Sequence, residues 1–597
     1  MTLRTGLLLL LPVLSSARAA PAPPPRPSAA LATLFAEDWE YHLQRSPTFA
    51  SVSGDRRWND RWDDLSAAGL EADHRHDLAF LEKLGKLTQG KLSETDRLNA
   101  ELLGREHRAW IEAYGLGLQY VPVNHMRGLP EDIQEFPGVQ NAGELGSQLR
   151  FETLEDYRDW VARLDGFPAY VDQTIALMQE GLRRKMVPAR AVLERIPPEL
   201  EKLVRSSPTG TAFYAPFTQI PTSIPAEERT RLSTSAERLI REKVQPAYRR
   251  LQDFLVGTYI PAAPAEVGIG RWPNGEAIYA WLAKRYTTTE LTPDQLHALG
   301  LSEVARIRAE LETVKARTGF KGTLAEFFRQ LRTDPRYYFK TGEELILHSR
   351  DLAKRIDPRL VRLFGTLPRA PYGVEPTPAA MAPNATHGFY YPGATDGSRA
   401  GTFWVNTYRP ETRPRFEMLP LTLHEAVPGH HLQTSLAAEQ QDVPAFRRHL
   451  SYVAYGEGWG LYSESLADEL GLVDDPLDKA GQLSFEIWRA MRLVVDTGMH
   501  VKGWTREQSV QYMLENSPRP ELDIRNEVDR YVAYPGQALA YKVGQLKIRE
   551  LRVRAEKALG PRFDVRSFHD AVLLSGSLPL DVLERRIDTW IAAQRGR

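Results

Sequence analysis

The chain has 597 residues, of which 42% are hydrophobic and 26% charged, with a formal net charge of −1 and no cysteine. These proportions are typical of an ordinary globular protein and exclude a largely disordered chain. The balanced charge gives no electrostatic reason to expect nucleic acid or an anionic membrane as a partner. Without cysteine, disulfides, a lipid-modified cysteine and thiolate zinc sites are excluded, so a transition metal would have to be bound by His, Asp or Glu.

The first twenty residues have the pattern of a signal peptide. A single early cation, Arg4, precedes an apolar run over 6–14, and Ala17-Arg18-Ala19 supplies the small residues that a signal peptidase reads. The apolar run is about half of the ~20 residues that a membrane span needs, so we expect cleavage and no stable membrane insertion afterwards. The sequence therefore predicts a signal peptide over 1–20, a proline-rich mature tip over 21–28, and an exported protein that is periplasmic or secreted.

From residue 29 to about 340, apolar residues recur at helical spacing and are interrupted by Pro and Gly. One predicted apolar stripe consists of Leu301, Val304, Ala305, Ile307 and Leu311. The polar segment 287–292 predicts that the helix carrying this stripe begins near Pro293. Large helical enzymes often fold as two lobes around one cleft, so we predict a single, mainly α-helical, bilobed domain over 29–597.

Between about 370 and 415 the helical pattern gives way to Pro, Gly, Thr and aromatic residues. The segment 402–407 has the β-branched and aromatic character of a short strand. Helical periodicity returns at Leu421 and continues to the C-terminus. We therefore expect a small β-sheet directly before a helix that carries chemically active residues, with the sheet forming one wall of the cleft.

Three of the fourteen histidines lie within eight residues, in the segment His424-Glu425-Ala426-Val427-Pro428-Gly429-His430-His431. In the common zinc helix, histidines at i and i+4 bind one ion, and the Glu beside the first His acts as a general base on the bound water. The spacing here is longer, so that standard pattern is absent. His424 is nevertheless a candidate ligand, and Glu425 is a candidate base.

Pro428 decides which second histidine can join His424. Proline removes an amide donor and clashes with the carbonyl four residues earlier, so the helix is predicted to bulge or break there. A bulge that absorbs two residues would bring His430 to face His424 across the metal. In an unbroken helix His431 would share the side of His424, but ~10 Å further along the axis. The bulge favours His430, and His431 is the alternative ligand.

The segment 451–469 offers a third ligand. Glu457 and Glu464 are seven residues apart and so lie on one helical face, where both carboxylates can reach one site. Gly456, Gly458 and Gly460 weaken the helix but permit close approach of another backbone. We predict that Glu457 is a metal ligand and that Glu464 orients a ligating histidine.

The order of a His-Glu…Gly-His helix, Glu457 and Glu464 resembles the gluzincin peptidases of the thimet oligopeptidase and angiotensin-converting-enzyme type. More closely, nearly the whole mature chain resembles the bacterial family known as domain of unknown function 885. The phrases that carry this closer resemblance include Asp396-Gly397-Ser398-Arg399, 424–433, Glu457-Gly458-Trp459, 492–498 and Tyr534-Pro535-Gly536-Gln537-Ala538.

The gluzincin resemblance implies a metallopeptidase-like fold and further site residues. Such enzymes place a strand beside the metal to pair with the peptide, which implies substrate binding by Trp404, Val405 and Asn406. They also supply a late tyrosine, often with a histidine, that donates to the oxyanion. The candidates for these roles are Tyr541 first, Tyr534 second, and His500 as the histidine.

We therefore expect one zinc ion held by His424, His430 and Glu457, and hydrolysis of short peptides with Glu425 as general base. Two alternatives stay open. The protein could be a non-catalytic exported metal-binding protein, or a metal amidohydrolase that acts on a non-peptide amide. Glu425 favours catalysis, because a purely structural site needs only ligands.

Overall fold

A computed structural model describes residues 28–125, 149–379, 382, 385–393, 399–440 and 442–596. The predicted signal peptide over 1–20 and residues 21–27 of the proline-rich tip lie outside these ranges. The fold is mainly α-helical with one small sheet, as predicted. None of the described helices is long and apolar enough to cross a membrane.

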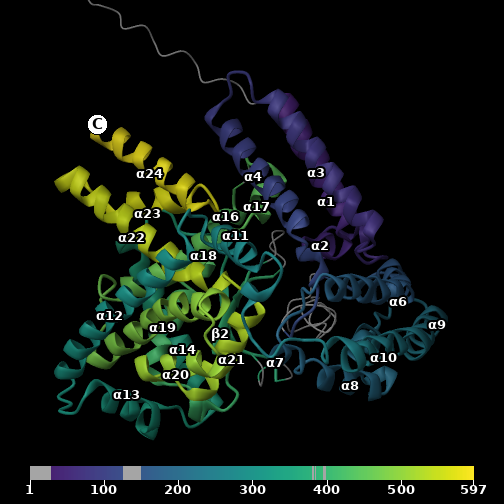
Figure 1. Cartoon of the computed structure of the whole chain (residues 1–597). Coiled ribbons are helices and arrows are strands. Elements are labelled where there is room, and N and C mark those ends of the chain that lie inside the picture. The colour runs from purple at the N-terminus through teal and green to yellow at the C-terminus, as the bar shows by residue number, and fades with distance from the viewer. Residues whose placement is uncertain are drawn as a thin grey trace, which may run out of the picture.

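The helices that precede the sheet in the chain extend across the whole width of the molecule (Figure 1). They are α1 (Ala29–Arg45), α2 (Pro47–Val52), α3 (Ala67–Leu87), α4 (Glu94–Leu116), α6 (Leu154–Arg183), α7 (Arg190–Leu193), α8 (Pro197–Arg205), α9 (Ala226–Leu239), α10 (Gln245–Phe254), α11 (Gly275–Thr287), α12 (Pro293–Arg317), α13 (Leu324–Thr333) and α14 (Gly342–Ile356).

The chain continues in helices after the sheet. They are α15 (Met418–Glu425), α16 (His430–Ala438), α17 (Ala445–His449), α18 (Val453–Glu464), α19 (Pro476–Val501), α20 (Arg506–Asn516), α21 (Glu521–Ala533), α22 (Ala540–Leu559), α23 (Val565–Leu573) and α24 (Leu580–Arg595). All of α19 from Ala480 to His500 is buried, so this helix is the central element around which the others pack.

The start of α12 follows from local chemistry. Thr292 caps the helix and forms a reciprocal capping box with Gln295, and Pro293 occupies the first turn. This confirms the predicted start near Pro293.

The predicted apolar stripe of α12 is only partly correct. Val304, Ile307 and Leu311 are buried, and α12 packs along α19. Leu301 and Ala305 are exposed instead. The helix is rotated so that Glu303 points inward, where its carboxylate lies 2.9 Å from Nζ of the buried Lys542.

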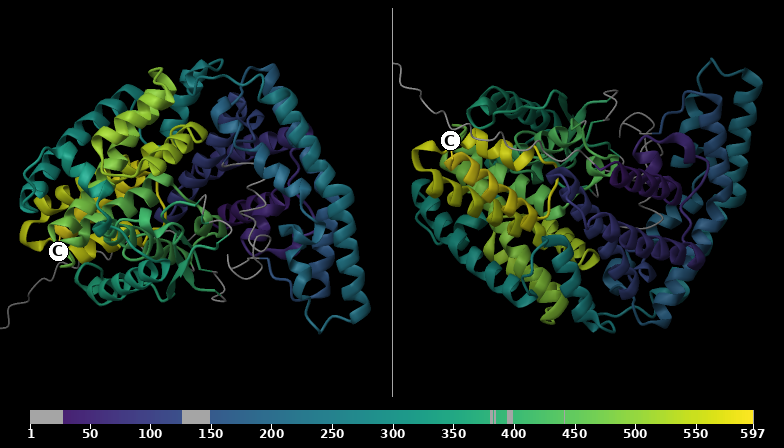
Figure 2. Two further views of the ribbon diagram at one scale, coloured as in Figure 1. Left: turned by 90° about the horizontal axis from the view of Figure 1, so that it is seen from below. Right: turned by 90° about the horizontal axis from the view of Figure 1, so that it is seen from above.

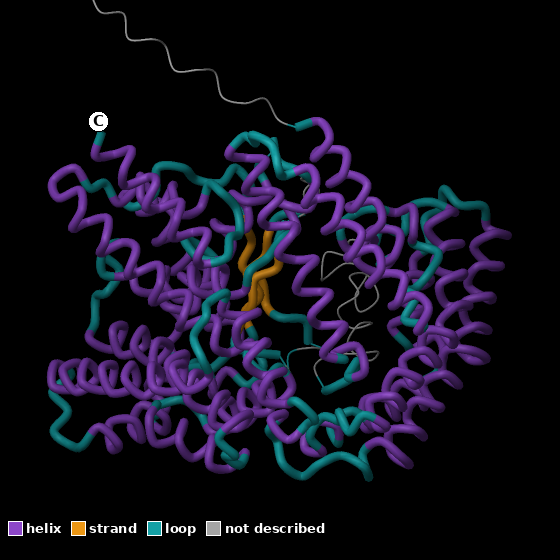
Figure 3. Tube along the Cα trace, turned by 45° about the horizontal axis from the view of Figure 1, so that its top comes forward, coloured by secondary structure: helices purple, strands orange, loops and turns teal. Residues whose placement is uncertain are grey.

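The sheet has three short strands, β1 (Tyr372–Pro376), β2 (Gly388–Tyr391) and β3 (Gly401–Val405). The strand order is β1-β3-β2, with β3 parallel to β1 and antiparallel to β2. Figure 3 shows the sheet enclosed by helices near the middle of the molecule. β3 confirms the strand that was predicted over 402–407.

Two hydrophobic cores give the molecule its bilobed shape. The smaller core runs from Trp62 to Ala263 in the sequence and is built mainly on α6, α8, α9 and α10. The larger core unites α1, α3 and α4 with the sheet and with all helices from α11 onward. Figure 2 shows the α6–α10 arm beside the larger lobe in both views.

Candidate metal centre

The histidine helix breaks between α15, which ends at Glu425, and α16, which begins at His430. Pro428 has no amide proton to continue the helical ladder, and the amide of His431 donates to the carbonyl oxygen of Ala426 at 3.0 Å. Glycine is required at 429, because a Cβ there would lie 1.8 Å from the carbonyl oxygen of His424. The predicted interruption at Pro428 is therefore confirmed.

The break turns His430 toward His424, so that their ring centres lie 4.7 Å apart. Nε2 of His424 and Nε2 of His430 lie 3.3 Å and 3.5 Å from Oε2 of Glu457. The candidate ligand atoms of these three residues lie within 4.8 Å of one another. We call His424, Glu425, His430, Glu457 and Glu464 the central cluster.

Both ring nitrogens of His424 face carboxylates. Nδ1 lies 2.8 Å from Oε1 of Glu464, on the side opposite Glu457. A neutral imidazole can donate through only one nitrogen, so contacts with two carboxylates require a second proton or a cation. In the metal-free chain burial lowers the pKa of His424, but its bonds to Glu457 and Glu464 outweigh burial and raise the pKa to about 9. This set of donors fits a divalent cation.

Glu464 is buried behind His424, in the position predicted for a residue that orients a ligand. Its Oε1 also lies 3.4 Å from a guanidinium nitrogen of Arg489, a buried residue of α19. The guanidinium of Arg489 stacks on Trp488 at 4.2 Å. Sequence reasoning missed Arg489, because an arginine inside an apolar helix forms no recognisable motif with residues on another helix.

Glu425 is the last residue of α15 and is 9% exposed. Burial raises its pKa by more than the nearby His424 and His430 lower it. A carboxylate whose pKa lies above its usual range accepts a proton more readily near neutral pH, which a general base requires.

His431, the alternative ligand, faces the sheet rather than the central cluster. Its Nδ1 accepts a hydrogen bond from the hydroxyl of Tyr390 at 2.9 Å. Its Nε2 lies 3.1 Å from the carbonyl oxygen of Ala370. Both nitrogens are thus occupied by neighbours of the sheet, and the structure brings His430 rather than His431 to His424.

The three C-terminal residues that were predicted to assist catalysis do not all lie beside the central cluster. The ring of Tyr541 packs against His424 with ring centres 6.5 Å apart. Tyr534 is half-buried at the C-terminus of α21. His500 lies ~16 Å along α19 from Arg489. Its Nδ1 accepts from the amide of Ile269 at 3.3 Å, and its Nε2 lies 3.0 Å from the carbonyl oxygen of Tyr531.

The structure thus gives both nitrogens of His500 backbone neighbours and does not bring them to the central cluster. His500 connects α19 to two other segments of the core.

The structure leaves no free strand edge for the peptide pairing that was predicted at Trp404, Val405 and Asn406. β3 is the middle strand, and its two neighbours occupy both of its edges. Asn406 is fully buried, and its Nδ2 donates to the carbonyl oxygens of Ala382 and Ala385 at 2.8 Å and 3.0 Å. Trp404 stacks on Phe389 within the sheet. The sequence indicated the strand but not its place in the sheet.

The glycines of α18 allow the close contacts that were predicted for them. A Cβ at Gly458 would lie 2.5 Å from the backbone of Gly544 on α22, and a Cβ at Gly460 would lie 2.7 Å from the ring of His424. α18 can therefore approach both α22 and the central cluster.

The structure contains a second group of candidate ligands, which sequence reasoning missed. Asp38, His42 and His107 bring ligand atoms within 4.8 Å of one another. A signal was available, because Asp38 and His42 are one helical turn apart and two further histidines precede Asp77 in the run 74–77.

The sequence matches, over residues 47–587, the family described as "Bacterial protein of unknown function (DUF885)". Among curated proteins, none matches the chain. The fold is similar to the crystal structure of a candidate lipoprotein from Colwellia psychrerythraea, with a TM-score of 0.86 and 29% identity over 94% of this chain and 99% of that chain. A candidate lipoprotein of unknown function from Shewanella oneidensis has a similar fold, with a TM-score of 0.69 and 17% identity over 94% of this chain and 99% of that one.

Proposed function

This chain belongs to the DUF885 family of bacterial proteins of unknown function, and we propose that it hydrolyses peptide bonds in short peptides with one zinc ion held by the central cluster. The observation that carries the proposal is the convergence of His424, His430 and Glu457 within 4.8 Å. Three protein ligands of this kind leave one position of a tetrahedral ion for water, as catalytic zinc sites do.

A zinc ion at this point would supply Lewis acidity to the substrate carbonyl and lower the pKa of a coordinated water. Glu464 holds the ring of His424 through Nδ1 and so keeps Nε2 directed at the ligand position. Glu425 follows His424 directly, and its raised pKa suits it to accept the proton of the attacking water and pass it to the leaving amine.

Tyr541 is the tyrosine that we assign to the oxyanion. Its ring packs against His424, and the guanidinium of Arg492 lies 4.2 Å from its ring centre. The hydroxyl would donate to the oxygen that becomes negative as water adds to the scissile carbonyl.

The preference for short peptides and the export of the protein rest on similarity. The order of the central cluster residues resembles that of gluzincin peptidases. The N-terminal signal pattern and the description of the Colwellia protein as a candidate lipoprotein both support export to the cell envelope or beyond. The present sequence has no cysteine, so lipid attachment through that residue does not apply to it.

The test is turnover of a mixed short-peptide library, read by mass spectrometry, with zinc-loaded wild type beside Glu425→Gln. Glu343→Gln is the matched control, because Glu343 is an exposed glutamate of α14. We expect cleavage by wild type and by Glu343→Gln, and none by Glu425→Gln. Absence of cleavage by zinc-loaded wild type would reject the peptidase and favour a non-catalytic metal-binding protein.

A further inference from the structure

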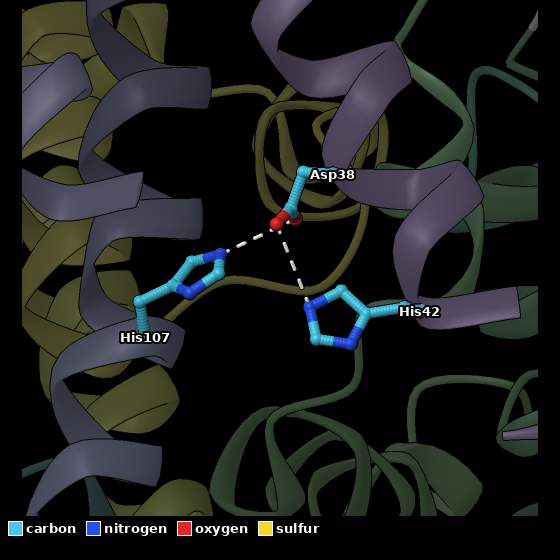
Figure 4. A group of neighbouring side chains, drawn as sticks. All are labelled: Asp38, His42 and His107. Atoms are coloured by element: carbon cyan, nitrogen blue, oxygen red, sulfur yellow. Dashed lines mark hydrogen bonds and ion pairs between the residues drawn. The ribbon is translucent and has the colours of Figure 1, made fainter. Parts of the chain in front are cut away.

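α1, α3 and α4 bring five polar side chains together far from the central cluster in the sequence. Asp38 and His42 lie one turn apart on α1, His76 and Asp77 lie on α3, and His107 lies on α4. We call these residues the N-terminal cluster. Figure 4 shows His42 and His107 each turning a ring nitrogen toward the carboxylate of Asp38.

The distances converge on the Asp38 carboxylate. Its Oδ1 lies 2.7 Å from Nε2 of His76 and 3.6 Å from Nε2 of His42. Its Oδ2 lies 3.2 Å from Nε2 of His107. All three histidines therefore present the same ring nitrogen to one carboxylate, which is 2% exposed.

The three imidazole rings form an almost equilateral triangle. Their centres are 5.7 Å apart for His42 and His107, 5.9 Å for His42 and His76, and 6.1 Å for His76 and His107. A zinc–nitrogen bond of about 2.1 Å places tetrahedrally arranged ring centres about 5.4 Å apart. The ligand atoms of Asp38, His42 and His107 lie within 4.8 Å of one another. Nε2 of His76 reaches the same carboxylate at 2.7 Å, so His76 is the candidate for the fourth ligand.

The hydrogen-bond partners of His107 and His42 also point to a cation between these rings and Asp38. Nδ1 of His107 lies 2.9 Å from Oδ1 of Asp77, the usual arrangement of a carboxylate behind a ligating histidine. If Nδ1 donates to Asp77, a neutral His107 directs a lone pair at Asp38, which is itself only an acceptor. Nε2 of His42 is enclosed, and among the residues that the structure describes it has no hydrogen-bond partner.

We propose that the N-terminal cluster is a second metal site, in which Nε2 of His42, His76 and His107 and a carboxylate oxygen of Asp38 bind one divalent transition ion such as zinc. Four protein ligands close the coordination shell, so the site is structural and holds α1, α3 and α4 together. The side chains of His42 and His76 are 28% and 24% exposed, so the N-terminal cluster lies close to the surface.

The test is the zinc content of the full-length protein, stripped of metal, reloaded with zinc alone and measured by elemental analysis. We expect two ions per chain in wild type, one in the double variant His42→Ala/His76→Ala, and one in Glu457→Gln/His430→Ala. His74→Ala is the matched control and should retain two ions. His74 lies on α3, as His76 does, but its ring stacks on Tyr114.

The crossed variants separate this inference from the proposed peptidase. If wild type binds one ion and His42→Ala/His76→Ala still binds one, the N-terminal site is rejected whatever the central cluster does. If wild type binds one ion and only Glu457→Gln/His430→Ala retains it, the N-terminal site stands and the central site fails.

A spectroscopic measurement guards against loss of folding in these variants. Glu457→Gln/His430→Ala loaded with Co²⁺ should show the visible bands of a tetrahedral ion. Addition of His42→Ala/His76→Ala to this variant should remove the bands while the circular dichroism stays helical. Tetrahedral bands that persist without His42 and His76 in this background would overturn the assignment.

Discussion

The two clusters use the same arrangement of ligands in different surroundings. In each, a buried histidine lies between two carboxylates: His424 between Glu464 and Glu457, and His107 between Asp77 and Asp38. In the central cluster a further carboxylate, Glu425, follows the histidine without serving as a ligand. The N-terminal cluster has no counterpart of Glu425 among its five residues.

The pKa values of Asp38 and Glu425 shift in opposite directions. Burial raises the pKa of Asp38, but its bonds to His107 and His76 outweigh burial and lower the pKa to about 2. Burial instead dominates at Glu425 and raises its pKa. A carboxylate that acid cannot easily protonate is a good ligand, whereas one with a raised pKa is a good proton acceptor. Similar ligands therefore support opposite roles, which we infer to be structural and catalytic.

The largest expected effect is that a substitution in the central cluster abolishes peptide turnover, whereas one in the N-terminal cluster does not. We expect His430→Ala to lower kcat/KM by more than the roughly 10–100-fold typical of residues that only orient a ligand, because the ion loses one of three protein ligands. His76→Ala should leave kcat/KM within about twofold, since its cluster performs no chemistry. Initial rates with a cleaved library peptide measure both, and equal losses would erase the proposed division of roles.

The second effect is the pH dependence of stability in the metal-free protein. The pKa of His424 is raised from 6.5 to about 9 in the folded state. Its stabilisation, about 3 kcal/mol, is fully present below pH ~6.5 and is lost as pH rises through about 9.

Asp38 contributes to the pH dependence of stability at low pH. Its pKa is lowered from 3.8 to about 2, so about 2 kcal/mol is present above pH ~3.8 and is lost as pH falls through 2. Denaturant unfolding across the pH range measures both. Zinc-loaded protein is the control, because an ion that replaces the proton on His424 should remove the loss of stability at high pH. A free energy of unfolding that stays constant at high pH in the metal-free protein would contradict the assignment.

The smallest effect concerns the two carboxylates that stand behind the ligating histidines. We expect Glu464→Gln and Asp77→Asn each to lower zinc affinity at its own cluster about 10–100-fold. Only Glu464→Gln should also lower peptide turnover. Competition with a chromophoric chelator measures the zinc affinity. Each substitution is tested in a protein whose other cluster has been removed by its double variant, so that only one site binds zinc. A loss of turnover in Asp77→Asn would show that the two clusters are coupled.

Several features of the central cluster could be predicted because they depend on neighbours in the chain. Pro428 and Gly429 interrupt the helix through a missing amide and a Cβ that does not fit, and this interruption selected His430 over His431. The spacing of Glu457 and Glu464 placed both on one face of α18. The predicted membership of the family known as domain of unknown function 885 was also confirmed.

Other predictions depended on distant contacts, which only the folded structure supplies. The sequence indicated a strand over 402–407, but only the pairing with β1 and β2 made β3 the middle strand and left it no free edge for a peptide. His500 looked like a catalytic histidine, yet Ile269 and Tyr531 occupy its two nitrogens.

By itself the sequence determined where helices begin, where the histidine helix breaks and which side chains share a helical face. These properties follow from backbone sterics and from periodicities of a few residues. Only the tertiary structure decided that α12 turns Glu303 inward, that Arg489 supports Glu464, and that α1, α3 and α4 assemble the N-terminal cluster. The reason is physical: a coordination shell or a buried ion pair forms only where surfaces from separate helices meet, and packing of the whole core selects those surfaces.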